Sequence, residues 1–140
     1  MAKLSNIKIT RLKKIDVIGG NVLHVIKKSD RGFCGLGEVY FSYIEPNAVK
    51  AWKLHMKMTL NLVVPQGNVR FVFCNPFEDK NFQIEEIGEG NYARITVPPK
   101  IWFGFKGISS RPSLIANVAN IEHDDSEVQK KEIDDFDYKW

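Results

Sequence analysis

This 140-residue sequence has few cysteines and no long apolar run. Cys34 and Cys74 lie outside any Cys-x-x-Cys motif, and two thiols cannot form a disulfide framework. We therefore expect two reduced cysteines, as in cytosolic proteins. No stretch approaches the roughly 18 apolar residues of a membrane span, and the N-terminal residues lack the apolar region of a signal peptide. These absences predict a soluble, cytoplasmic protein with no membrane partner.

An excess of charge of one sign is also lacking. The sequence has 20 lysines and arginines against 17 acidic residues, a net charge of +3, and the basic residues are scattered. A nucleic-acid surface needs a concentrated basic patch, often with exposed aromatic residues, so we expect no nucleic-acid partner. The modest basic excess suits an anionic small molecule such as a nucleotide diphosphate.

Several motifs of cofactor and nucleophile chemistry are absent. The sequence has no glycine-rich phosphate loop, no Gly-x-Ser-x-Gly motif, and no strand–GxGxxG–helix unit. It also lacks the His-x-x-x-His and His-Glu-x-x-His spacings of metal sites. We therefore predict neither a bound cofactor nor a protein metal centre.

Short runs of β-branched and aromatic residues dominate the sequence, and turn residues separate them every 8–12 residues or so. The expected strands are 7–10, 13–18, 21–27, 38–44, 49–55, 58–64, 69–74, 82–87, 92–97, 101–105 and 114–120. No useful helical period occurs before residue 121. This pattern predicts an all-β protein with a single jelly-roll β-barrel domain over residues 1–140. The charged tail, 121–140, is expected to be partly helical and to pack on the barrel through its terminal aromatic residues.

His55 is the most informative residue, because it stands between Lys53 and Lys57 in an otherwise apolar strand region. Strand alternation would place all three on one face. Two nearby ammonium groups lower the pKa of a histidine, and a neutral imidazole is what a general base must be at neutral pH. The lysines could also stabilise an enolate or a diphosphate. A solvated strand face with alternating charge remains the alternative from pattern alone.

A metal-binding role for His55 is disfavoured by its neighbours. A known metal-binding pattern on a barrel strand would need a second histidine two residues before His55 and a carboxylate four residues after it. Lys53 and Thr59 occupy these positions, and neither is a suitable ligand.

The stretch 98–107, Pro-Pro-Lys-Ile-Trp-Phe-Gly-Phe-Lys-Gly, is the second informative one. If it is extended, Trp102 and Phe103 point to opposite faces, and one of them enters the barrel mouth. An aromatic ring there can stack on a sugar or a base, although core packing is equally compatible with the pattern.

Three motifs in this order resemble the RmlC-like cupins, the dTDP-4-dehydrorhamnose 3,5-epimerase family. Asp30-Arg-Gly-Phe33 resembles the early Asp/Arg-Gly-Phe loop of the family. Trp52-Lys-Leu-His55 and the following 60–67 resemble its Arg-Gly-Leu-His strand and the next strand. Residues 96–105 resemble its Ile-Pro-x-Gly-x-x-His-Gly-Phe segment. The resemblance covers residues 30–120.

This resemblance implies a jelly-roll barrel, a homodimer that exchanges N-terminal strands, and a nucleotide-diphosphate sugar as substrate. The implied reaction is metal-free proton abstraction beside the ketone of a nucleotide-linked 4-keto-6-deoxy sugar, in deoxysugar or surface-polysaccharide (lipopolysaccharide) biosynthesis. His55 takes the role of the base, and Arg31 matches the arginine that meets the diphosphate. The family's arginine three residues before the histidine is Trp52 here, so Lys53 is predicted to supply the cation.

The sequence also departs from the family pattern. The family's catalytic tyrosine falls near Ala116, so the acid is open, with Tyr40, Tyr43 and Tyr138 as candidates. This reduced set favours a one-centre epimerase or a sugar 3,4-ketoisomerase over a two-centre epimerase. A non-catalytic nucleotide-sugar-binding cupin and, more remotely, a metal cupin oxygenase are the other readings. The predicted substrate-binding residues are Arg31, Lys57, Thr59, Asn61, Trp102 and His123.

Overall fold

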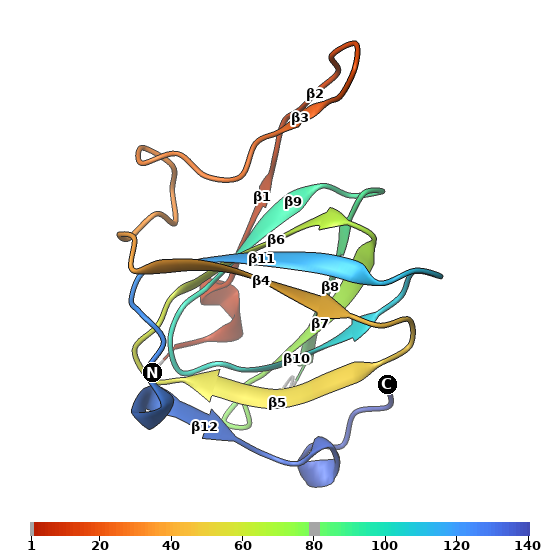
Figure 1. Ribbon diagram of the computed structural model, residues 1–140. Helices are drawn as coiled ribbons and strands as arrows, with labels where there is room; N and C mark the ends of the chain where they lie inside the picture. Colours follow the sequence, from red (N-terminus) through yellow and green to blue (C-terminus); the bar gives the residue numbers. More distant parts are fainter. Residues whose placement is uncertain (1, 79–81) are drawn as a thin grey trace.

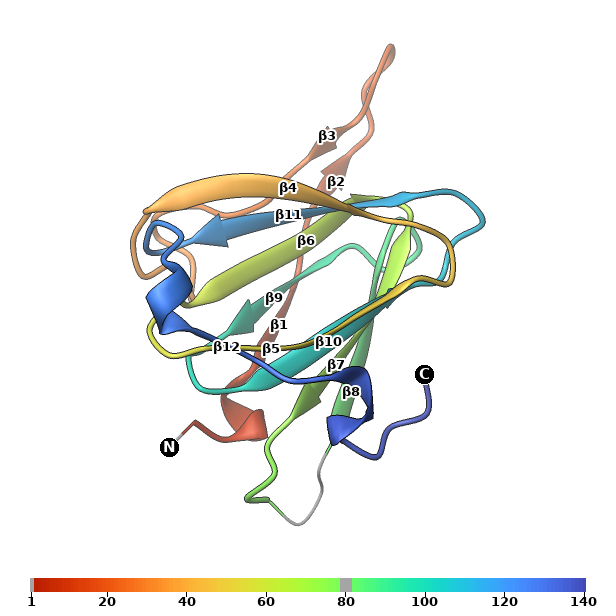
Figure 2. The same ribbon diagram turned by 60° about the horizontal axis from the view of Figure 1, so that its bottom comes forward.

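The computed structural model describes residues 2–78 and 82–140. Two five-stranded antiparallel sheets face each other (Figures 1 and 2). The strand order of the first sheet is β1 (Lys8–Arg11), β9 (Ala93–Val97), β6 (Leu60–Gln66), β11 (Ser113–Ala119) and β4 (Glu38–Ile44). The strand order of the second sheet is β12 (Val128–Lys130), β5 (Val49–His55), β10 (Trp102–Gly107), β7 (Asn68–Cys74) and β8 (Phe82–Gly88). Strands β4 to β7 alternate between the sheets, so the predicted all-β jelly roll is confirmed.

The short β2 (Lys14–Ile15) and β3 (Val22–Leu23) form a separate two-stranded hairpin that projects away from the two sheets (Figures 1 and 2). The sequence predicts longer strands here, but the hairpin pairs with no other strand among the described residues and is largely exposed. No helix in the described part of the chain is long and apolar enough to cross a membrane.

The strands on which the site is built have the bounds that alternation predicts. β4 and β5 begin and end at the expected residues, 38–44 and 49–55. The charged segment near the C-terminal end holds two 3-10 turns, Asp125–Glu127 and Ile133–Asp135. The turns agree with the expected partial helix. The strand β12 between them was not predicted, because three residues carry no readable period.

Two apolar clusters form on opposite faces of the second sheet. The larger lies between the sheets and is built from leucine, isoleucine, valine and phenylalanine side chains. The smaller covers the outer face of the second sheet. It contains Trp52, Leu54, Val72, Cys74 and Trp102, against which Phe136, Tyr138 and Trp140 pack. The C-terminal segment is thus attached to the outside of the sheet by aromatic contacts.

A bulge in β5 sets which side chains enter the barrel. Phe103 of β10 pairs with Lys53, but the next residue, Gly104, pairs with Ala51. The extra residue of β5, Trp52, therefore turns outward into the smaller cluster, while Lys50 and Lys53 both face the interior.

The turn between β6 and β7 carries the chain from one sheet to the other. Gly67 there has a φ of 82°, and a Cβ on it would lie 2.9 Å from the Cα of Ser113. Only glycine fits both the left-handed backbone and the close approach of β11.

Candidate active site

A cavity of about 180 Å³ lies between the two sheets. Its polar lining comes from β4 (Tyr40 and Ser42), β5 (Lys50, Lys53 and His55) and β11 (Asn117). The remaining lining is apolar and consists of Leu60, Leu62, Phe71, Phe103, Phe105 and Ile115. An apolar pocket with a few convergent polar groups is typical of a small-molecule site.

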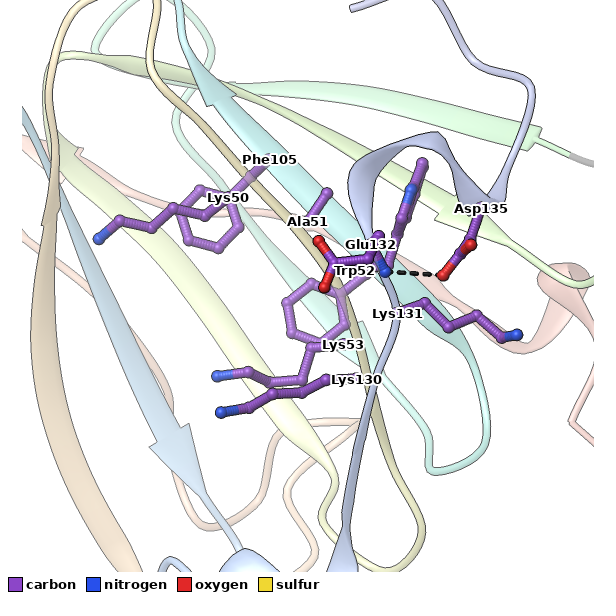
Figure 3. Close-up of a pocket in the computed structure, with 10 residues that line it drawn as sticks. Lys50, Ala51, Trp52, Lys53, Phe105, Lys130, Lys131, Glu132 and Asp135 are labelled. Carbon is purple, nitrogen blue, oxygen red and sulfur yellow. Dashed lines mark hydrogen bonds between the residues drawn. The ribbon is translucent and has the colours of Figure 1, made fainter.

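A second hollow, of about 470 Å³, lies against the C-terminal segment (Figure 3). It shares Lys50, Lys53, Phe103 and Phe105 with the cavity. Its other wall is formed by Ala51, Trp52, Lys130, Lys131, Glu132 and Asp135. The two spaces thus adjoin at the shared residues; we call them together the groove, which has Lys50, Lys53 and Lys130 on one side and His55 in its inner part.

His55 is the last residue of β5 and is buried beside Glu127. Its Nδ1 lies 2.8 Å from Oε2 of Glu127, and the other carboxylate oxygen accepts the backbone N–H of Met58 at 2.9 Å. Because a carboxylate can only accept hydrogen bonds, Nδ1 carries the ring proton and donates a hydrogen bond to Glu127. The Nε2 lone pair is then free to act as a base, and the ring lines the cavity.

Several groups act on the pKa of His55. Burial of the ring is the largest effect and lowers the pKa. The hydrogen bond from His55 to Glu127 and the negative charge of Glu127 raise the pKa, whereas electrostatic repulsion from Lys53 and His123 lowers it. The net shift is downward from 6.5, so the imidazole is neutral at pH 7. This geometry agrees with the requirements of a general base.

Tyr40 faces the same cavity from the opposite sheet. Its hydroxyl oxygen accepts a hydrogen bond from Nδ2 of Asn117 at 2.9 Å, so the hydroxyl proton is available for a further partner. Burial raises the pKa of Tyr40, which keeps the phenol protonated at neutral pH. Of the three tyrosines left open by the sequence, Tyr40 is the one that lines the cavity. Tyr43 is exposed, and Tyr138 lies in the outer aromatic cluster.

Lys53 lies in the cavity lining next to His55, on the predicted shared face. Burial lowers the pKa of Lys53, and the charges of Lys130 and Lys50 lower it further. Lys57 does not share this face, because β5 ends at His55 and Lys57 lies in the following turn, exposed to solvent.

Phe103, and not Trp102, enters the cavity, which corrects the placement expected for Trp102. Trp102 pairs with Leu54 and points outward, where its ring meets that of Phe136 at 5.7 Å between centroids. Phe103 points inward and stacks on His55, with ring centroids 6.2 Å apart and planes at 18°. The opposite facing of the two rings was predicted correctly, but the sequence did not decide which of them enters, and Trp102 is not in the cavity lining.

Asn61 and Thr59 also lie outside the cavity lining, which corrects the face expected for Asn61. The turn after His55 resets the alternation, so Leu60 and Leu62 point inward and Asn61 points outward. The Asn61 side chain accepts from Thr96 at 2.6 Å and donates to the backbone of Gly32 at 3.1 Å. The backbone N–H of Thr59 donates to Asn120.

Arg31 and His123 lie at the periphery. The backbone oxygen of Arg31 accepts from the guanidinium of buried Arg94 at 3.1 Å, while its own side chain is exposed and is not part of the cavity lining. His123 is exposed, and its Nε2 lies 2.8 Å from Asp125.

Sequence reasoning missed Glu127 as the partner of His55. The two residues are 72 positions apart, and Glu127 belongs to a run of charged residues that reads as solvated surface. The burial of Glu127 in that run is visible only in the fold.

Among the described residues, no three His, Cys, Asp or Glu side chains gather as ligands for a metal ion.

Comparisons with known proteins place this geometry in a family. No protein-family model matches the sequence. A probable low-salt glycan biosynthesis epimerase of Haloferax volcanii is 35% identical over 83 residues, which are 56% of this chain and 53% of the relative. The chain therefore spans about half the length of that curated relative.

Solved structures match over most of the chain. A dTDP sugar isomerase from Desulfovibrio desulfuricans G20 has a TM-score of 0.87 and 32% identity, covering 93% of this chain and 86% of that one. A dTDP-4-dehydrorhamnose 3,5-epimerase from Sulfolobus tokodaii has a TM-score of 0.82 at 17% identity, covering 98% and 84%, and this match shows the fold alone. From the isomerase match and the shared jelly roll, the chain belongs to the RmlC-like cupin family of nucleotide-sugar epimerases and isomerases.

Proposed function

We propose that the protein is an isomerase that epimerises a nucleotide-linked 4-keto-6-deoxy sugar by removing a proton next to the ketone. The observation that carries this proposal is the buried His55–Glu127 pair at the end of a cavity that also holds Tyr40. A neutral base, oriented by a carboxylate and facing a hydroxyl donor across an enclosed space, is the arrangement that proton abstraction and return require.

The proposed reaction assigns one role to each side chain. Nε2 of His55 removes the proton α to the ketone, and the negative charge moves to the ketone oxygen as an enolate. The ammonium of Lys53, which lines the same cavity, stabilises that oxyanion. The hydroxyl of Tyr40 then returns a proton to carbon from the side of the opposite sheet, which inverts that centre.

A 3,4-ketoisomerase is the second candidate. His55 and Tyr40 are the cavity-lining side chains suited to move protons between carbon and oxygen, and the lysines are better suited to stabilise charge. One base and one acid are sufficient to move a ketone between neighbouring carbons. The same pair cannot readily invert two carbons, so a two-centre epimerase is the less favoured outcome.

Solvent exchange tests the function directly. The protein is incubated in deuterium oxide with a panel of dTDP- and UDP-linked 4-keto-6-deoxy sugars, and products are analysed by NMR. Deuterium is expected at a carbon next to the ketone in one of them, with the position distinguishing epimerisation from ketone transfer. Nucleotide-sugar binding by calorimetry without any exchange would contradict the enzyme and support a non-catalytic binding cupin.

We place this reaction in deoxysugar or surface-polysaccharide biosynthesis in the cytoplasm, where nucleotide sugars are made. Support comes from the similarity to the Haloferax relative, a probable epimerase of glycan biosynthesis. Sugar analysis of surface polysaccharide from a strain without the protein tests this setting, because one deoxysugar should be lost.

We further propose that the protein is a homodimer that exchanges N-terminal segments. The β2–β3 hairpin projects from the barrel with Ile15, Val17, Ile18 and Val22 exposed, and the outer face of β4 exposes Val39, Phe41 and Tyr43. Exposed apolar surfaces of this kind mark association sites. Light scattering at micromolar concentration is expected to give twice the mass of 16.0 kDa, and a monomer would contradict the proposal.

A further inference from the structure

Three lysines gather at the outer end of the cavity. Lys50 and Lys53 come from β5, and Lys130 comes from β12, directly opposite Lys53 in the antiparallel register. Figure 3 shows the side chains of Lys53 and Lys130 extending side by side, with Lys50 directed to the same side. Strands that lie far apart in the sequence thus bring three ammonium groups to the basic side of the groove.

This arrangement is electrostatically unfavourable by itself. Like charges placed directly opposite each other destabilise a strand pair, and Lys53 is also half-buried. Within residues 2–78 and 82–140, none of the three forms an ion pair with a carboxylate, and the ammonium of Lys50 donates only to the backbone oxygen of Tyr43 at 2.9 Å. A bound anion would remove the repulsion.

The next residue along β12 behaves in the opposite way. Lys131 turns to the outer face, with its Nζ 5.6 Å from the ring centre of Trp102 and 5.8 Å from that of Phe136. Figure 3 shows it directed away from Lys130. Two adjacent lysines of equal charge therefore have different surroundings, one against the lysines of the groove and one on the aromatic cluster.

The sizes of the two spaces suggest how a substrate is divided between them. The cavity of about 180 Å³ is smaller than the roughly 300–1,000 Å³ of pockets that enclose a whole ligand, so it admits only part of a nucleotide sugar. The adjoining hollow of about 470 Å³ lies within that range and carries the lysines. A sugar in the cavity would leave its diphosphate at the lysines.

We propose that Lys130, together with Lys50, binds the diphosphate of the substrate, while Lys53, which also lines the inner cavity with His55, is left for the enolate. This inference rests on the proposed function and assigns a substrate contact to the C-terminal segment, whereas the sequence resemblance points to Arg31 for that group. Trp52, which stands where the family has an arginine, turns outward and forms hydrogen bonds with the C-terminal segment. Its backbone pairs with that of Lys131, and its indole N–H donates to the backbone oxygen of Ile133. In this proposal, a positive charge at the diphosphate comes from Lys130 of β12 and not from an arginine at position 52.

Lys130→Gln and Lys131→Gln form a charge-matched pair for the test. Binding of inorganic pyrophosphate and of dTDP is measured by calorimetry at low and moderate salt, with thermal melting to confirm folding. Lys130→Gln is expected to weaken binding of both ligands about 10- to 100-fold, because one charge-assisted contact is lost. Lys131→Gln is expected to change it less than about twofold, because Lys131 borders the hollow but its ammonium lies over the rings of Trp102 and Phe136 and not with the other lysines.

Equal weakening by the two variants would show an effect of net charge only and overturn the proposal, as would unchanged binding in Lys130→Gln. If Lys130→Gln does not fold, Lys50→Gln replaces it, since Lys50 lies outside β12, and the same tenfold criterion applies. The outcome is separable from the proposed function. Lys130-dependent pyrophosphate binding without sugar exchange supports the anion site and contradicts the isomerase, whereas exchange with Lys130-independent binding does the reverse.

Discussion

Replacement of His55 by asparagine is expected to lower the rate of deuterium incorporation by about 10²–10⁴-fold, the usual contribution of a general base. Asparagine can still donate to Glu127, so the buried carboxylate keeps a partner and the fold is preserved. The position of His55 at the end of β5, inside the cavity, means that the solvent hydroxide ion has poor access to the same carbon. The measurement is NMR of the substrate in deuterium oxide, with circular dichroism as a check on folding.

Tyr40→Phe is the matched comparison, because it removes only the hydroxyl from the other side of the cavity. If His55 abstracts the proton and Tyr40 returns it, Tyr40→Phe should lose product formation while the substrate's own α-hydrogen still exchanges. The two variants thus separate base from acid. Unchanged turnover in His55→Asn would remove His55 from the base role.

Glu127→Gln is expected to lower kcat by about 10²–10⁴-fold, because it reverses the tautomer of His55. The backbone N–H of Met58 is a fixed donor and takes the single amide oxygen of glutamine. The amide NH2 then faces Nδ1 of His55, so the ring proton moves to Nε2, the nitrogen needed as the base. A wrong tautomer costs up to about 10⁴-fold in enzymes that use such a pair.

The pH profile gives a second readout for this variant. The pKa of His55 is lowered by burial, so the wild-type acid limb of kcat/KM should lie below 6.5, with activity lost as the pH falls. Glu127 raises that pKa, so its removal should move the limb to lower pH still. The same shift implies that the free energy of unfolding declines as the pH falls below 6.5, because the unfolded chain binds the proton more readily.

Asp125→Asn is the control for Glu127→Gln. It removes a negative charge two residues away, from an exposed side chain that pairs with His123 and not with His55. A small change in kcat is expected. Equal losses in both variants would show that Glu127 acts through general charge and would contradict the tautomer argument.

The strands that carry the site were predictable, because alternation in 38–44 and 49–55 is a local property of the sequence. His55 and Lys53 were placed on one face for the same reason. Predictions that needed alternation to continue past a strand end went wrong, as for Asn61, because a turn resets the facing of side chains. The bulge at Trp52 is likewise set by pairing with β10, which the sequence of β5 does not contain.

Glu127 and Lys130 could not be predicted, because their roles depend on a three-residue strand whose pairing with β5 is a long-range property. Nothing in their spacing distinguishes them from the other charged residues of the tail. The aromatic residues 136, 138 and 140 gave a usable signal for packing, but they did not indicate which strand the segment would join.

The pairing of β12 with β5 also affects how the protein behaves in solution. Without β12, the β5 edge would present unpaired backbone donors and acceptors beside Trp52 and Trp102, whose rings the C-terminal segment now covers. Such edges recruit strands from other molecules. The short β12, which carries Lys130, covers this edge and makes a poor template for further pairing. The segment that holds the proposed base, His55, through Glu127 therefore also protects against aggregation, and selection for solubility and for the proposed catalysis would act on the same few residues.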